Sequence, residues 1–358
     1  MQLRILHTTE YDYLGSVDFA QHMVHLTPRE GAGQTVLRHV LQISPAPSAR
    51  NETTDVFGNQ RSFFSLQAPH ERLVVQADSE VTTCAPLPLP DGPAWTAQTW
   101  ERVREHFRYR AQAPYDPACE FLFASPYVPR DDAFAAFARP VFAPGLPVLA
   151  AARALMQKIH TELSYETDST EVNTPALEAL AQGKGVCQDF AHIMLGCLRS
   201  LGLPARYVSG YLLTQPPPGK ARLIGADASH AWVALYVPLP AGFEPAPEAP
   251  MAGPGAWFDF DPTNNRCGWG SPGEDYVTLA VGRDFSDVSP MRGVIQGGAQ
   301  HELEVAVTVA PPDEWDQLAT RAPAPAPVGT QPQSQSQTQT QTDTESHRQS
   351  QSQIQTSG

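Results

Sequence analysis

The hydrophobic and polar positions of residues 3–83 alternate over short distances. The β-prone runs, divided by turn clusters rich in glycine and asparagine, cover residues 3–13, 17–26, 36–43, 61–66 and 72–81. Short strands separated by turns are typical of an antiparallel β domain. We therefore predict a β-rich, sandwich-like domain over residues 1–84. Residues 85–96 follow as a proline-rich linker, because no central strand could accommodate so many prolines.

After the linker, the apolar positions take on a helical spacing. Two helices are predicted at residues 97–107 and 148–163, and in the second the apolar side chains recur at steps of three and four along one face. A short helix with Thr174 as its N-cap and Pro175 as its first residue is predicted next. A longer helix is predicted over residues 187–201, where an apolar stripe is formed by Phe190, Ile193, Met194, Cys197, Leu198 and Leu201.

Beyond this helix the sequence again shows strand patterns, which end before residue 311. The further β-prone runs lie at residues 205–213, 230–237, 257–261, 276–281 and 302–309. Together with the helices they predict an α+β core over residues 97–310. Residues 311–358 are rich first in proline and alanine and then in glutamine, serine and threonine. Such a composition cannot bury enough apolar surface to offset its ordering entropy, so a disordered tail is predicted.

Composition and charge indicate which partners, cofactors and cellular location to expect. The chain of 358 residues has a formal net charge of −14 and no basic stripe, so nucleic acid is not expected as a partner. No apolar run approaches the ~18 residues of a membrane span, and no membrane partner is expected. The five cysteines form no C-x-x-C pair, which predicts neither a disulfide framework nor a zinc ribbon. We expect a cytoplasmic protein without cofactor or metal.

Cys187 is the candidate nucleophile. It lies at the predicted start of the helix over residues 187–201, where unpaired backbone N–H groups and the helix dipole favour a thiolate. The alternative, a cysteine that serves only as a small buried side chain, suits Cys197 better because that residue lies in the middle of the helix. His192 is a weaker candidate base, since the helix rotates it away from Cys187.

His230 and Asp261 are the candidate base and orienting carboxylate. His230 begins a strand, and Asp261 ends the next strand because Pro262 follows it. Asp259 lies on the same face of that strand as Asp261 and is the rival orienting residue. A cysteine at a helix start, a histidine and a carboxylate are the three groups of a thiol triad.

Several motifs, in this order, resemble the bacterial branch of the transglutaminase-like superfamily. They read G-V-C-Q-D-F-A, L-G-L-P-A-R-Y-V-S-G-Y, S-H-A-W-V and W-F-D-F-D-P-T-N, and the start of the chain, with R-I-L-H-T-T-E-Y-D-Y and D-V-F-G-N-Q, resembles the β-rich domain that often precedes this core. The resemblance implies a papain-like core with its cysteine helix packed on an antiparallel sheet. It assigns Cys187, His230 and Asp261 to the triad, with Asp261 preferred to Asp259 because the family's aspartate stands in an Asp-Pro-Thr turn.

The resemblance also implies chemistry on amide or peptide bonds of a protein or peptide substrate, through a cysteine thioester. Gln188 follows Cys187 where the calcium-dependent animal enzymes have tryptophan, and no EF-hand loop is present, so calcium dependence is not expected. Hydrolysis is ranked above transfer to an amine because the sequence shows no amine site. The backbone N–H of Cys187 is one expected oxyanion donor, while Tyr165 and Gln188 stay open as the second. A non-catalytic peptide-binding module of the same fold is the alternative.

Overall fold

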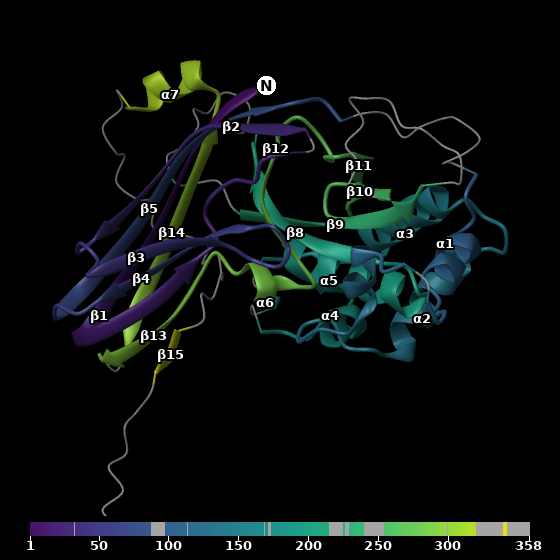
Figure 1. The fold of residues 1–358 in the computed structure, drawn as a ribbon, viewed down its shortest axis with the longest axis horizontal. Coiled ribbons are helices and arrows are strands. Elements are labelled where there is room, and N and C mark those ends of the chain that lie inside the picture. The colour runs from purple at the N-terminus through teal and green to yellow at the C-terminus, as the bar shows by residue number, and fades with distance from the viewer. Residues whose placement is uncertain are drawn as a thin grey trace, which may run out of the picture.

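The computed structural model describes residues 1–31, 33–86, 97–112, 114–167, 169–170, 173–214, 225, 229–239, 254–298, 300–319 and 339–341. Most of the predicted linker and most of the predicted disordered tail lie outside these residues. Figure 1 shows a long β-sheet beside a second sheet that is covered by helices.

The N-terminal β region is an eight-stranded sheet. Its strands are β1 (Gln2–Val24), β2 (Gln34–Ser44), β3 (Ala49–Thr54), β4 (Gln60–Leu66), β5 (His70–Thr83), β13 (Met291–Gly297), β14 (His301–Ala310) and β15 (Gln339–Gln341). β1 joins two predicted strands into one of 23 residues. Its first part pairs with β5 and β14, and its second part pairs with β4 and β13. Because its partners change along its length, the sheet curls around an apolar core of its own.

The prediction that residues 302–309 belong to the catalytic core is wrong. β14 pairs with β1 from Arg4 opposite Ala310 to Tyr13 opposite His301, so the chain returns to complete the N-terminal sheet. The alternating pattern correctly indicates a strand, but the pattern specifies only which face is buried and not which strand is the neighbour. The N-terminal sheet is therefore built from both ends of the described chain.

The second sheet carries the predicted catalytic strands. Its antiparallel order is β11 (Arg266–Trp269), β10 (Gly255–Asp261), β9 (Ser229–Pro238), β8 (Ala205–Leu212) and β12 (Tyr276–Gly282). Two side chains of the N-terminal region hold β12 in place. Asn59 Nδ2 donates to the Val281 carbonyl at 2.7 Å, and Gln34 Nε2 donates to the Thr278 carbonyl at 2.9 Å.

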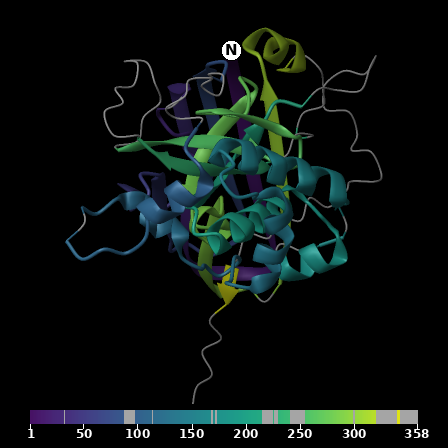
Figure 2. The ribbon, with the colours of Figure 1, turned by 90° about the vertical axis from the view of Figure 1, so that its right-hand side faces the viewer.

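Helices cover this second sheet, as the turned view in Figure 2 shows. They are α1 (Trp100–His106), η1 (Pro117–Leu122), α2 (Asp132–Ala138), η2 (Arg139–Val141), α3 (Val148–Glu162), α4 (Ala176–Gln182), α5 (Cys187–Ser200) and α6 (Phe285–Val288), with a two-residue pair of parallel strands, β6 (Ser164–Tyr165) and β7 (Lys184–Gly185), beside them. The last helix, α7 (Pro312–Ala319), contacts β1 of the N-terminal sheet instead. The predicted helices over 97–107, 148–163 and 187–201 are present. At α4 the N-cap is Pro175, without a side-chain hydrogen bond, so the predicted Thr174 cap is wrong.

α5 is the centre of the second domain. All residues from Gln188 to Arg199 are buried, although the sequence predicted one apolar stripe. The helix packs on β8 and β9 with one side and contacts α2, α3 and α4 with the others. Burying a large aliphatic or aromatic side chain stabilises a fold by about 1.5–3 kcal/mol, so α5 contributes strongly to the core and is held in a fixed position.

Gly210 of β8 provides a stability test, because it pairs with His230 of β9. A methyl group there would overlap the Val277 carbonyl and lie 2.6 Å from the Trp232 ring. Gly210→Ala should lower the free energy of unfolding by about 1–3 kcal/mol, measured by urea denaturation. Gly15→Ala is the control, since the nearest described atom to its added methyl group would be Gly298 Cα at 3.9 Å, an ordinary van der Waals distance. Equal stability of the two variants would contradict the packing around His230.

Candidate active site

Cys187 is the first residue of α5, and the turn before it is fixed by Asp189. Asp189 Oδ2 accepts hydrogen bonds from the Val186 backbone N–H at 2.9 Å and from Thr170 Oγ1 at 2.6 Å. A Cβ atom at position 185 would lie 2.6 Å from that same oxygen, so only glycine allows the close approach. Cys187 is half-buried at the positive end of the helix dipole. Its thiol is thus held in place and remains accessible.

His230 and Asp261 meet beside this helix start. His230 Nε2 donates to Asp261 Oδ2 at 2.7 Å, from the beginning of β9 to the end of β10. Asp261 is fully buried and His230 is 9% exposed. Cys187 lies close enough to His230 to contribute to the shift of its pKa. Because Asp261 occupies Nε2, the other ring nitrogen, Nδ1, is the one left for the thiol. The structure thus brings the three predicted residues together in the order thiol, imidazole and carboxylate.

Asp261 accepts hydrogen bonds on both oxygens. Tyr276 Oη donates to Oδ2 at 2.6 Å, and Asn264 Nδ2 donates to the same oxygen at 2.8 Å. The backbone N–H groups of Thr263 and Asn264 reach Oδ1 at 2.9 and 3.2 Å. Desolvation by burial opposes ionisation, but the charge of His230 and these side-chain hydrogen bonds outweigh it and lower the pKa of Asp261. The carboxylate is therefore ionised and held in one orientation.

The same pair sets the protonation of His230. Burial lowers the pKa of this imidazole, but the charge and the hydrogen bond of Asp261, together with Cys187, raise it from 6.5 to about 10. The resulting stabilisation of the fold is complete below pH 6.5 and is lost as the pH rises through about 10. At neutral pH the ring therefore carries the positive charge that stabilises a neighbouring thiolate.

Asp259, the rival orienting residue, has a different partner. It accepts a hydrogen bond from Trp232 Nε1 at 2.9 Å. Burial raises the pKa of Asp259 to about 6, although Arg206 and the Trp232 hydrogen bond act against the rise. The Trp232 ring lies over His230, with centroids 6.1 Å apart and planes at 27°. Asp259 thus orients the tryptophan behind His230, while Asp261 contacts His230 itself.

The alternative base, His192, is not placed for proton transfer to Cys187. Its Nε2 accepts a hydrogen bond from the Phe285 backbone N–H at 3.2 Å, and its ring lies between Tyr127 and Tyr207. Burial lowers the pKa of His192 to about 4, so the ring is neutral. His192 is therefore a core residue that supports α6.

Tyr165 and Cys197 differ in their exposure to solvent, which assigns one to the site and the other to the core. Tyr165 is 53% exposed at the mouth of the site, where burial and the charges of Cys187, Asp189 and Asp261 raise the pKa of its hydroxyl to about 12. The hydroxyl therefore stays protonated and able to donate. Cys197 is fully buried, and burial raises the pKa of its thiol. Cys197 is a core residue.

The sequence did not predict that Tyr276 and Asn264 donate hydrogen bonds to Asp261. Asn264 belongs to the same D-P-T-N motif as Asp261, and the turn that this motif forms could have predicted that the two residues lie close together. Tyr276 lies on β12, which is not a neighbour of β10 in the sheet, and only the folded arrangement brings its hydroxyl to Asp261.

The described ranges contain neither a cluster of metal-ligating side chains nor a membrane-spanning helix. Those residues contain no cluster of three or more histidine, cysteine or acidic side chains that could hold a metal ion. None of the described helices is both long and apolar enough to cross a bilayer.

Comparison with known proteins places these features in a family. The model of the bacterial transglutaminase-like N-terminal region matches residues 3–82, and the transglutaminase-like superfamily model matches residues 135–262, which include Cys187, His230 and Asp261. The uncharacterized protein Rv2569c of Mycobacterium tuberculosis is 38% identical over 312 residues, covering 86% of this chain and 92% of the relative. The uncharacterized protein ML0607 of Mycobacterium leprae is 32% identical over 314 residues, with 86% and 98% covered.

A solved structure shares the fold. A protein of Cytophaga hutchinsonii, described as a candidate cysteine protease, superposes with a TM-score of 0.59 at 20% sequence identity. The match covers 86% of this chain and 90% of that one. The predicted fold class, a transglutaminase-like α+β core preceded by a β-rich domain, is confirmed.

Replacing Asp261 should change the protonation of His230. In Asp261→Asn the compensating charge is lost while the burial remains, so we expect the pKa of His230 to fall from about 10 to below 6.5. The measurement is an NMR pH titration of the histidine rings, with His230 identified by its absence in His230→Gln. Asp259→Asn is the matched control and should leave that pKa near its wild-type value. A pKa that stays near 10 in Asp261→Asn would contradict the account.

Proposed function

Because this chain belongs to the transglutaminase-like superfamily, we propose that it is a cysteine-dependent enzyme that acts on amide or peptide bonds. The observation that carries the proposal is the 2.7 Å contact between His230 and a fully buried, ionised Asp261 beside the Cys187 thiol. The family match alone would also allow a binding module without turnover. A module of that kind has no need for a buried carboxylate supplied with donors on both oxygens, whereas a catalytic imidazole does.

The geometry supports a thioester mechanism. His230 holds the proton of the pair as an imidazolium, and the Cys187 thiolate attacks the substrate carbonyl carbon. The tetrahedral oxyanion accepts hydrogen bonds from the backbone N–H of Cys187 and from a second donor, for which Tyr165 and Gln188 are the candidates. When the intermediate collapses, the C–N bond breaks and His230 gives its proton to the leaving amine or ammonia. A water molecule, deprotonated by His230, then hydrolyses the thioester.

We rank hydrolysis above amine transfer. An amine that accepts the acyl group must compete with water, which is present at a far higher concentration. A transferase therefore has to bind the amine and shield the thioester from water. Among the described residues, the half-buried Cys187 and the 53% exposed Tyr165 are both in contact with solvent at the site. This supports a peptidase or amidase with a protein or peptide as its substrate.

We place the protein in the cytoplasm. The described structure has all five cysteines as free thiols, which fits a reducing compartment. Neither nucleic acid nor a membrane is proposed as a partner, in keeping with the net charge of −14.

To test whether water or an amine accepts the acyl group, a glutamine-containing peptide is incubated with the protein, with and without a labelled primary amine. We expect the acid product in both reactions and no stable incorporation of the label. Cys187→Ala should reduce the rate by at least about 10³-fold, because the nucleophile is lost. Cys197→Ala is the matched control and should retain activity if it folds. Incorporation of the amine that depends on Cys187 would reverse the ranking, and activity in Cys187→Ala would overturn the mechanism.

A further inference from the structure

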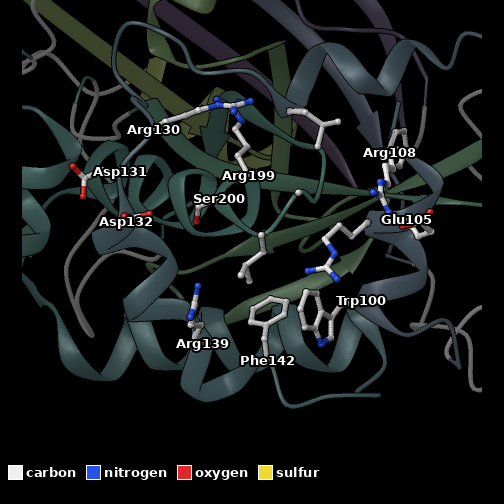
Figure 3. A pocket seen from close by; sticks show the side chains of 15 residues that line it. Trp100, Glu105, Arg108, Arg130, Asp131, Asp132, Arg139, Phe142, Arg199 and Ser200 are labelled. Atoms are coloured by element: carbon white, nitrogen blue, oxygen red, sulfur yellow. Dashed lines mark ion pairs between the residues drawn. The ribbon is translucent and has the colours of Figure 1, made fainter. Parts of the chain in front are cut away.

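A cavity of about 1130 Å³ lies at the opposite end of α5 from Cys187. Since α5 has 14 residues, the two places are about 20 Å apart. We call this cavity the arginine basin, because its lining contains five arginines, Arg104, Arg108, Arg130, Arg139 and Arg199. Figure 3 shows Arg108 and Arg139 on different walls of the basin.

Three of these guanidinium groups form no ion pair with a carboxylate among the described residues, although Arg104 also lies near the charge of Glu101, outside the lining. Arg104, Arg130 and Arg139 are exposed and take part in none of the ion pairs found there. Arg108 reaches Glu105 Oε2 at 3.6 Å. Arg199, by contrast, is buried, and its Nε and Nη2 donate to the Ala205 carbonyl, so it supports the floor and is not available for a ligand.

The three carboxylates of the lining, Glu105, Asp131 and Asp132, offset only part of the charge of its five arginines and leave a formal excess of +2. Glu105 contacts both Arg108 and Arg110, which lies outside the lining. Asp131 Oδ1 caps α2 by accepting the Ala133 backbone N–H at 2.8 Å. The basin therefore holds an excess of positive charge on a chain with a formal net charge of −14. A concave surface with an excess of charge of one sign attracts ligands of the opposite sign.

The floor of the basin is partly apolar. Trp100 packs edge-on against Phe142, with ring centroids 5.8 Å apart, and Leu122 and Leu201 also line the cavity. The Arg104 guanidinium lies 4.8 Å from the centre of the Trp100 ring. Aromatic surface beside guanidinium groups suits a ligand that carries both carboxylates and apolar side chains.

We propose that the arginine basin binds an acidic peptide segment. The four exposed arginines come from α1, from the residues just after α1, from the segment before α2 and from η2, so their charges are spread over the walls. A single phosphate would need guanidinium groups that converge on one point, whereas an extended peptide presents carboxylates at intervals and can place an apolar side chain on Trp100. The basin and Cys187 are separate, so this binding does not depend on the proposed catalysis.

The test uses the full chain carrying Cys187→Ala, so that no peptide is consumed. The probe is a fluorescein-labelled octapeptide, Glu-Glu-Phe-Glu-Glu-Phe-Glu-Glu, followed by fluorescence anisotropy. We expect saturable binding that weakens between about 50 and 200 mM salt as screening increases. The same peptide with glutamine in place of every glutamate should bind at least about tenfold more weakly, because charge-assisted hydrogen bonds are lost.

The variant that tests the site is Arg130→Gln with Arg139→Gln. Both side chains are exposed, with no hydrogen bond found among the described residues, so the fold should survive. We expect at least about tenfold weaker binding of the glutamate peptide. Arg153→Gln, an exposed arginine of α3 outside the lining, is the matched control and should change binding less than about twofold.

Three results would overturn the proposal. They are unchanged binding in the double variant, equal binding of the glutamine peptide, and displacement of the glutamate peptide by sodium tripolyphosphate at lower concentration than by unlabelled glutamate peptide. The last result would assign the basin to phosphate ligands. Loss of binding in the double variant, with Arg153→Gln unaffected, would support the proposal even if no enzymatic activity were found.

Discussion

The buried contact between His230 and Asp261 is the interaction on which the rest of the site depends. Removing a carboxylate and an imidazolium from water costs several kcal/mol for each ion unless hydrogen bonds compensate. Here the compensation comes from Tyr276 of β12 and Asn264 after β10, which both donate to Asp261. The second sheet therefore holds an ionised carboxylate where water does not reach it, and this fixes both the charge and the direction of the His230 ring.

The thiol depends on a different part of the core. α5 is buried on every side, and Asp189 closes the turn in front of it, so Cys187 has little freedom to move away from His230. The two sites of the protein therefore lie at opposite ends of one buried helix, and they differ in their charge and chemistry. At its beginning is a thiol beside a buried ion pair, and at its end is the arginine basin with an excess of exposed guanidinium groups.

Much of this arrangement could be predicted from the sequence because its signals are local. The helix of residues 187–200 follows from apolar spacing and the glycine before it, and Asp261 follows from the proline that ends its strand. The pairing of β14 with β1 could not be predicted, because an alternating pattern gives a buried face without naming the neighbouring strand. The contact of Tyr276 with Asp261 and the gathering of arginines from α1 and η2 arise only when distant segments fold together.

The most direct test of the account is the reactivity of the thiols toward iodoacetamide at pH 7, followed by mass spectrometry of the individual cysteines. If His230 and Asp261 activate Cys187, it should be alkylated at least about tenfold faster than exposed Cys84, and His230→Ala should remove the difference. Cys84 serves as the internal control in the same chain. Alkylation of Cys187 at the rate of Cys84, or a fast rate that persists in His230→Ala, would contradict the claim that these residues form a working thiol site.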